Sequence, residues 1–202
     1  MSTPEYLKMR FDAYENDGIT TYPANAYDVN GTWDTNRYTN WQKEFIGGKA
    51  VSNSTQFSIG GGSSQTTYLM SGSHRKDGTV FPGDFGYKRN NFLLSVGHRS
   101  KDNRFDFQGN VQKNMQKNNL MAADLATAIY LAPNAPALYD KEGKINWENN
   151  TFENPLAKLN SKYISETSEL TSLLKLSYKP FSKLILGIQG GLTTAVVDEM
   201  RT

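Results

Sequence analysis

The stretch Arg104-Phe-Asp-Phe-Gln-Gly-Asn-Val-Gln112 alternates polar and apolar side chains more regularly than any other part of the chain. In an extended strand, successive side chains point to opposite faces. Phe105, Phe107 and Val111 would therefore share one face, and the polar residues between them the other. A sheet with one apolar and one polar face is typical of antiparallel structure. This stretch predicts an all-β fold.

The same period of two recurs in five other segments, which makes six expected strands. They are residues 51–60, 66–74, 87–98, 104–112, 169–178 and 184–194. Gly-, Ser- and Asn-containing turn signals, such as Gly60-Gly-Gly-Ser-Ser-Gln65, separate several of them. The sequence therefore predicts an antiparallel, up-and-down arrangement.

The connections between these strands alternate in length. Residues 61–65, 99–103 and 179–183 form short connections, whereas 75–86 and 116–168 form long ones. Strands near the ~9–11 residues that cross a bilayer, with short turns on one side and long loops on the other, are typical of outer-membrane β-barrels. A soluble β-sandwich would show the same polar–apolar alternation along its strands, with its polar face in water, but it has no reason to sort its loops in this way.

The two interpretations differ in where the apolar side chains lie. A soluble module would bury them against a second layer, whereas a barrel section would leave them as a band around its outside. The residues that discriminate are Phe57, Phe105, Phe107, Leu174 and Leu186.

Two segments predict helices. Residues 3–17 have Thr3 as a candidate N-cap, Pro4 in the first turn and Gly18 placed to end the helix. Residues 120–131 predict a short helix that stops before Pro133. Residues 19–50 lack a clear period and predict a structured loop.

Composition excludes several classes of function. The chain of 202 residues has a net charge of +2 and no cysteine. It has no basic stripe for a nucleic acid, and no disulfide framework or cysteine-based zinc site. Met1 is followed by Ser-Thr-Pro-Glu, which is not a signal peptide. No run approaches the ~20 apolar residues of a membrane helix.

Candidate site residues are confined to loop aromatics. Trp33, Tyr38, Trp41 and Trp147 lie near Asp and Asn residues, as in glycan-binding surfaces, although simple loop packing would explain each of them. His74 and His98 have no third metal ligand in view. The scattered carboxylates show neither a calcium-binding spacing nor an acid/base pair. We therefore predict no catalytic residue, no metal and no cofactor, and do not expect an enzyme.

Several sequence blocks occur in a distinctive order. They are YLKMRFDAYENDG at 6–18, WD at 33–34, RYTNWQKE at 37–44, GG at 47–48, FSIGGG at 57–62, TYLMSG at 67–72, KDG at 76–78, APNAP at 132–136, YDKEGK at 139–144 and NPL at 154–156. This ordered set covers nearly the whole chain and resembles the SusC/RagA family of TonB-dependent outer-membrane transporters. Asn40 stands where that family usually has Asp.

The resemblance implies a section of a large transmembrane β-barrel that a plug domain closes. Residues 1–50 would be a helix plus a structured extracellular loop, and 51–115 four antiparallel barrel strands. Residues 116–168 would be a long extracellular loop with a short helix, and 169–202 two further strands. The family imports glycan fragments or peptides with the TonB complex and a SusD-like surface lipoprotein, in contact with outer-membrane lipid.

The resemblance also implies that much of such a transporter is missing from this sequence. A signal peptide, a TonB-contacting segment, a plug and most strands have no counterpart here. We therefore expect a barrel fragment that is inactive alone, because two open sheet edges in lipid leave backbone groups unpaired. The alternative is a soluble all-β carbohydrate-binding module that uses the loop tryptophans.

Overall fold

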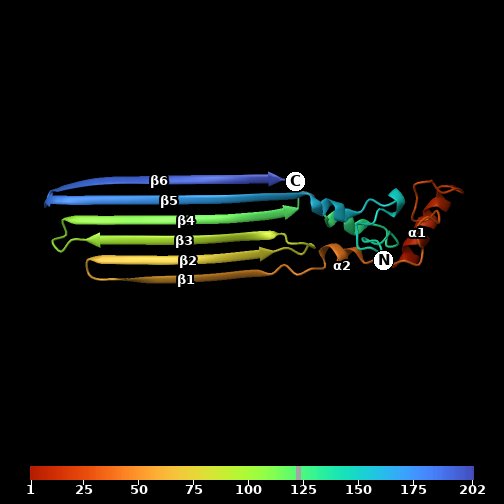
Figure 1. Cartoon of the computed structure of the whole chain (residues 1–202), viewed down its shortest axis with the longest axis horizontal. Coiled ribbons are helices and arrows are strands. Elements are labelled where there is room, and N and C mark those ends of the chain that lie inside the picture. Colours follow the sequence, from red (N-terminus) through yellow and green to blue (C-terminus); the bar gives the residue numbers. More distant parts are fainter. Residues whose placement is uncertain (122–123) are drawn as a thin grey trace.

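The computed structural model describes residues 1–121 and 124–202 and contains one six-stranded antiparallel sheet (Figure 1). Each strand pairs with the next one in the chain, without crossovers, which confirms the predicted up-and-down fold. The sheet is open, with β1 and β6 at its edges. The strands are β1 (Ser52–Gly62), β2 (Thr66–Gly78), β3 (Gly86–Arg99), β4 (Phe105–Met121), β5 (Lys162–Phe181) and β6 (Leu184–Arg201).

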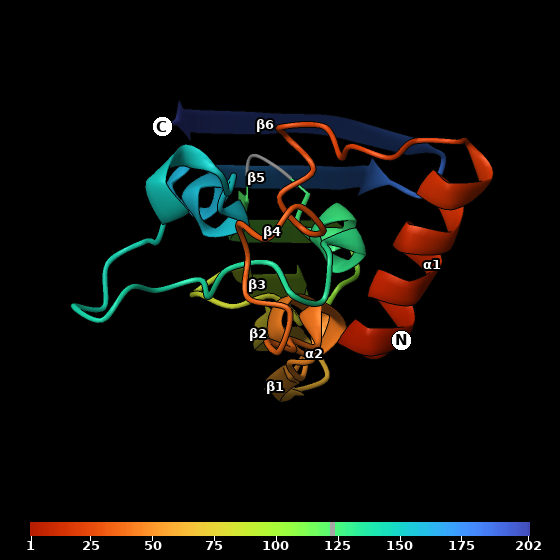
Figure 2. The same cartoon turned by 90° about the vertical axis from the view of Figure 1, so that its right-hand side faces the viewer.

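The two ends of the sheet differ. Short turns at 63–65, 100–104 and 182–183 lie at one end, and the long connections gather at the other (Figure 1). We call residues 1–51, 79–85 and 124–161 the loop cap. Figure 2 looks onto the cap along the strands, with α1 to one side of the other loops. Its helices are α1 (Thr3–Asn16), α2 (Trp41–Ile46), η1 (Ala126–Tyr130), η2 (Glu148–Asn150) and η3 (Pro155–Asn160).

The hydrophobic core lies in the loop cap and not on the sheet. The larger of two buried clusters joins α2, η1 and η3, and the smaller one joins α1 to residues 26–29. All buried apolar residues in the described chain belong to the cap. The cap therefore packs as a small globular unit. The stability of the sheet depends instead on the hydrogen bonds between its strands and on whatever covers its faces.

The strands extend further toward the cap than the alternation predicted. β4 continues to Met121 instead of ending near residue 112, and β5 begins at Lys162 instead of residue 169. Residues 113–119 are mostly Lys, Asn and Gln, so this part of β4 has few apolar side chains on either face. The ladder continues there because backbone pairing with β3 and β5 requires no apolar face.

The helix predictions are partly corrected. α1 ends as predicted before Gly18, which has a left-handed φ of +69°. Its N-cap is Ser2 and not Thr3, because the Glu5 carboxylate accepts hydrogen bonds from the Ser2 backbone N–H and hydroxyl. Of the helix expected at 120–131, β4 takes the first two residues, η1 covers Ala126–Tyr130, and residues 122–123 lie outside the described part. None of the helices in the described residues is long and apolar enough to cross a membrane.

Candidate functional site

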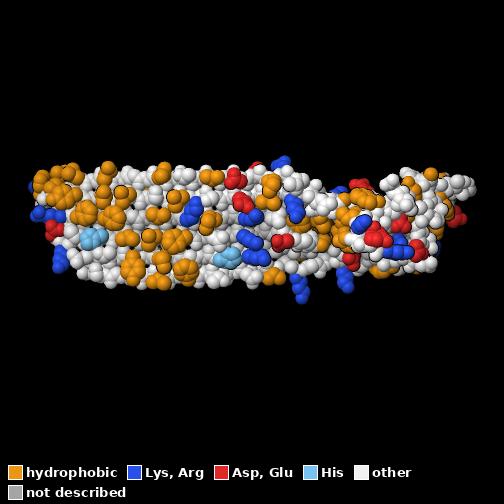
Figure 3. Space-filling model, in the orientation of Figure 1, with side chains coloured by type: hydrophobic (Ala, Val, Ile, Leu, Met, Phe, Trp, Pro, Cys, Tyr) orange, Lys and Arg blue, Asp and Glu red, His pale blue; other side chains and the backbone are white. Residues whose placement is uncertain are grey.

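The sheet has one apolar face, and its apolar side chains gather toward the turns (Figure 3). The strand register places them side by side across all six strands. We call this set the apolar band: Phe57, Ile59, Tyr68, Met70, Phe92, Leu94, Val96, Phe105, Phe107, Val111, Leu170, Leu174, Leu176, Tyr178, Leu186, Ile188 and Leu192.

The apolar band is not covered by any other part of the described chain. Phe57 is 53% exposed and Ile188 is 68% exposed. A contiguous apolar surface of this extent marks contact with a partner or a membrane. On β5 the band runs from Leu170 to Tyr178, which is about 27 Å of antiparallel strand. A strand tilt of about 40° would make this about 21 Å, slightly less than the ~25 Å apolar band of outer-membrane barrels.

The opposite face of the sheet is mainly polar. Neutral side chains dominate it, including Gln56, Ser73, Asn91, Asn110, Gln112 and Thr193. Asn91 Nδ2 donates to Ser73 Oγ at 2.9 Å, so adjacent strands are linked on this side. Leu69, Leu93 and Leu173 are apolar exceptions. Such a face is compatible with water or with a polar domain packed against it.

A basic hollow lies on this polar face near the turns. Its volume is about 480 Å³, and Arg99, Arg104, Lys175 and Lys179 line it together with Asp106. Arg99 Nη2 pairs with the Asp106 carboxylate at 2.9 Å, which leaves the hollow with an excess of positive charge. It would favour an acidic surface over a basic one.

Two buried asparagines hold the loops of the cap together. Asn134 Nδ2 donates to the Asp28 carbonyl at 3.0 Å, joining the long connection to the N-terminal segment. Asn154 Nδ2 donates to the carbonyls of Leu138 and Asn146 at 2.7 and 2.9 Å. These bonds satisfy backbone groups that a loop would otherwise leave buried and unpaired.

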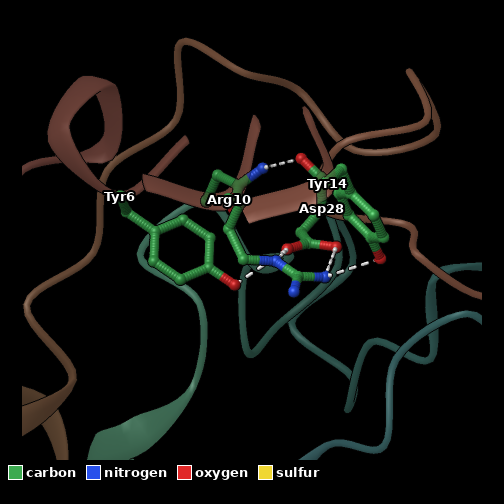
Figure 4. Close-up of polar contacts among 5 residues, drawn as sticks. Tyr6, Arg10, Tyr14 and Asp28 are labelled. Carbon is green, nitrogen blue, oxygen red and sulfur yellow. Dashed lines mark hydrogen bonds and ion pairs between the residues drawn. The ribbon is translucent and has the colours of Figure 1, made fainter. Parts of the chain in front are cut away.

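An ion pair fixes α1 to the loop that follows it (Figure 4). Arg10 Nε donates to Asp28 Oδ2 at 2.8 Å, and the Tyr6 hydroxyl donates to the same oxygen at 2.8 Å. Arg10 also lies 5.0 Å from the centre of the Tyr14 ring, a cation–π contact. The Arg10 and Asp28 charges compensate each other, so this cluster has the features of a structural contact.

The pKa values in this cluster follow from burial and pairing. Burial and the hydrogen bond to Asp28 raise the pKa of Tyr6 to about 12. Burial alone would raise the pKa of Asp28, but the hydrogen bonds from Arg10 and Tyr6 outweigh it, so the pKa is lowered. The hydrogen bond to Asp28 raises the pKa of Arg10. The ion pair is therefore charged at neutral pH.

The four predicted loop aromatics lie in the cap but do not form one surface. Trp41 is 3% exposed, stacks on Phe45 and donates its Nε1–H to the Ala132 carbonyl at 2.8 Å. Its ring thus stabilises the core of the cap. Tyr38 is 55% exposed and Trp147 is 47% exposed. Ligand binding by these aromatics stays a prediction.

Trp33 borders a hollow in the cap that combines aromatic and charged groups. Trp33 Nε1 donates to Thr151 Oγ1 at 3.0 Å, and its ring meets Phe152 edge-on. The hollow has a volume of about 320 Å³, and the exposed ring of Tyr130 also lines it. The sequence does not single out Tyr130, because this residue comes close to Trp33 only when the loops fold together.

Neither histidine lies in a metal site. His74 Nδ1 bonds to Asn90 Oδ1 at 2.7 Å, and His98 Nδ1 bonds to Thr66 Oγ1 at 2.8 Å, each across one strand pair. Within residues 1–121 and 124–202, no group of three or more His, Asp or Glu side chains could hold a metal ion.

Comparisons with known proteins give a structural relative only. No protein-family model and no curated protein matches the sequence. The fold is similar to part of a solved structure described as the RagAB peptide importer in the 'closed-closed' state, with a TM-score of 0.62 and 18% sequence identity. The similarity covers 84% of this chain but 20% of that chain, so this chain spans about a fifth of its length.

This similarity shows a shared fold. The chain is a six-stranded, up-and-down antiparallel sheet with a loop cap, and it is similar in structure to one section of a transport protein.

Proposed function

We propose that this chain forms a section of the barrel wall and extracellular loops of an outer-membrane importer of the SusC/RagA type. The observation that carries the proposal is the exposed apolar band on one face of a long, open sheet whose other face is polar. Lipid against the apolar face and water or a plug domain against the polar face would give each face a matching environment.

The discriminating side chains support this proposal over a soluble carbohydrate-binding module. Phe57, Phe105, Leu174 and Leu186 are exposed, and Phe107 is half-buried. A soluble module would cover these side chains with a second layer, and the described residues form no such layer. The buried core lies instead in the loop cap at one end of the strands.

The proposed substrates and partners rest on the family resemblance and on the structural relative. A peptide importer is similar in fold, so peptides are one substrate class, and glycan fragments are the other that the resemblance implies. We propose a SusD-like surface lipoprotein that contacts the loop cap, and energy supply by the TonB complex through parts outside these residues. The proposed role is transport without catalysis.

Single-cysteine labelling tests the membrane orientation. The chain contains no cysteine, so a cysteine introduced at one position is the only thiol among these residues. Leu94→Cys places a fluorophore on the apolar face, and the adjacent Ser95→Cys places it on the polar face. In the full-length product of the gene, reconstituted in lipid, a lipid-borne quencher should quench the first and aqueous iodide the second. Equal quenching of both by iodide would refute the barrel.

The genetic neighbourhood tests the partners separately. A plug-encoding stretch upstream of these codons and a gene for a SusD-like lipoprotein downstream are expected. A stand-alone reading frame with neither would favour the soluble module instead.

A further inference from the structure

Three lysines form a row on the apolar face, between the apolar band and the loop cap. Lys76 of β2 lies directly opposite Lys88 of β3, which lies directly opposite Lys117 of β4. Directly opposed side chains have Cβ atoms about 4.5–5.5 Å apart, and like charges at such positions repel. A row of three positive charges therefore costs stability unless an anion compensates it.

The neighbouring carboxylates compensate only one end of this lysine row. The same register row continues with Glu166 of β5 and Asp198 of β6, and Lys117 Nζ pairs with Glu166 Oε1 at 2.5 Å. In the described chain, neither Lys76 nor Lys88 lies within ion-pair distance of a carboxylate. Figure 3 shows a short column of basic and acidic side chains crossing the middle of this face.

A small cavity opens beside the lysine row. Its volume is about 60 Å³, several times the ~10–15 Å³ that one water requires, and all three lysines line it. Asp77 and Asp84 also line it, but the Asp77 carboxylate already accepts hydrogen bonds from Ser52 and Arg75. With Lys117 paired to Glu166, Lys76 and Lys88 face only the Asp84 carboxylate, so the cavity combines room for a small group with an excess of positive charge.

The position of the row indicates what that group belongs to. One step toward the turns, the same face carries His74, Asn90 and Met115. The next step brings Phe57 and Phe92 of the apolar band, with Lys113 beside Phe92 and bonded through its Nζ to Ser168 Oγ at 2.6 Å. A molecule lying along this face, from the turns toward the cap, would contact mainly apolar side chains first and the ammonium groups of the lysine row last. This is the order of acyl chains and headgroup in a lipid.

We propose that Lys76, Lys88 and Lys117 bind the phosphate-bearing headgroup of a membrane lipid whose acyl chains lie on the apolar band. Lysine ammonium groups bind phosphate as point charges, and the lipid phosphate would remove the repulsion along the row. The inference rests on the proposed function, because acyl chains reach the apolar band only if this face meets the membrane.

Lipid binding to the full-length product of the gene in detergent tests the inference. Native mass spectrometry would compare phosphatidic acid with phosphatidylcholine of the same acyl chains. We expect preferential binding of phosphatidic acid. The triple variant Lys76→Gln/Lys88→Gln/Lys117→Gln should lower that preference by about tenfold or more, since each Lys near an anionic lipid surface contributes to the free energy of binding.

Two controls separate this site from general electrostatics. Lys43→Gln/Lys141→Gln/Lys144→Gln removes the same charge from exposed cap lysines and should leave the preference unchanged. Glu166→Gln removes the carboxylate paired with Lys117 and should strengthen phosphatidic acid binding. An equal loss in both triple variants would overturn the inference.

The remaining outcomes distinguish the two proposals. Equal binding of both lipids overturns the lysine site but leaves the membrane-facing band intact. Binding of neither lipid overturns both. Displacement of phosphatidic acid by inorganic phosphate at equal concentration would assign the row to a free anion and overturn the lipid assignment.

Discussion

Val111 and Gln112 are neighbours in β4, and their side chains lie on opposite faces of the sheet. Val111 aligns with Leu94 of β3 on the apolar face, whereas Gln112 aligns with Leu93 on the polar face. Both side chains are exposed. Two adjacent positions with the same strand pairing therefore differ only in the environment that each face meets.

This pair predicts opposite responses to one added charge. Val111→Arg should destabilise the reconstituted full-length protein by about 2–4 kcal/mol, because it places a cation near the middle of the proposed lipid-facing band. Gln112→Arg should change stability by less than about 0.5 kcal/mol, as for other exposed polar positions. Urea unfolding in lipid vesicles, followed by tryptophan fluorescence, measures both. Equal effects at the two positions would contradict the assignment of faces.

The sequence was informative about the sheet because a period of two is a local property. Arg104–Gln112 displays both faces within nine residues, and the structure aligns them as expected. The local pattern did not predict that β4 continues through residues 113–121, because Lys, Asn and Gln on both faces are also typical of a loop. Strand pairing there depends on backbone partners in β3 and β5, which no local pattern displays.

The cap was much less predictable than the sheet. Trp41 bonds to Ala132, 91 residues away, and Asn134 bonds to Asp28, 106 residues away. An aromatic beside polar residues has the same appearance in sequence whether its ring lies in a core or on a surface. Whether such a ring is buried or exposed depends on how the two loops pack together.

The core position of Trp41 predicts a graded loss of cap stability. Trp41→Ala should cost about 3–5 kcal/mol because it leaves a cavity beside Phe45. Trp41→Phe keeps most of the volume but loses the hydrogen bond to Ala132, and should cost about 1–3 kcal/mol. Protease resistance of the cap against urea concentration measures both. Trp147→Ala, at an exposed position, is the matched control and should change stability little.

The Arg10–Asp28 pair predicts that acid loosens α1. The folded-state pKa of Asp28 is lowered, so its contribution to stability is fully present above the unfolded pKa of about 3.9 and is lost as pH falls through the folded pKa. The protection of α1 against hydrogen exchange should therefore not vary with the titration of Asp28 near neutral pH, and it should fall below about pH 4. Asp28→Asn should weaken α1 docking at neutral pH and flatten the acid response. An unchanged acid response in Asp28→Asn would assign it to other groups.

The two sheet edges predict that residues 1–202 alone form no pore. β1 and β6 each pair with one neighbour only, so a row of backbone N–H and C=O groups on each outer edge is left without a strand partner. In lipid, each unsatisfied group costs several kcal/mol, roughly 2–7 kcal/mol by transfer measurements. Closing six strands of this length on themselves would leave no room for a water-filled lumen, since barrels of about eight strands are already filled by side chains.

Planar-bilayer recordings of the isolated chain should therefore show no steady conductance, whereas the full-length product is the positive control for correct refolding into lipid. Steady pores of defined size from residues 1–202 would show that the edges close, by self-association or otherwise, and would refute the assignment of this sheet as one section of a larger wall.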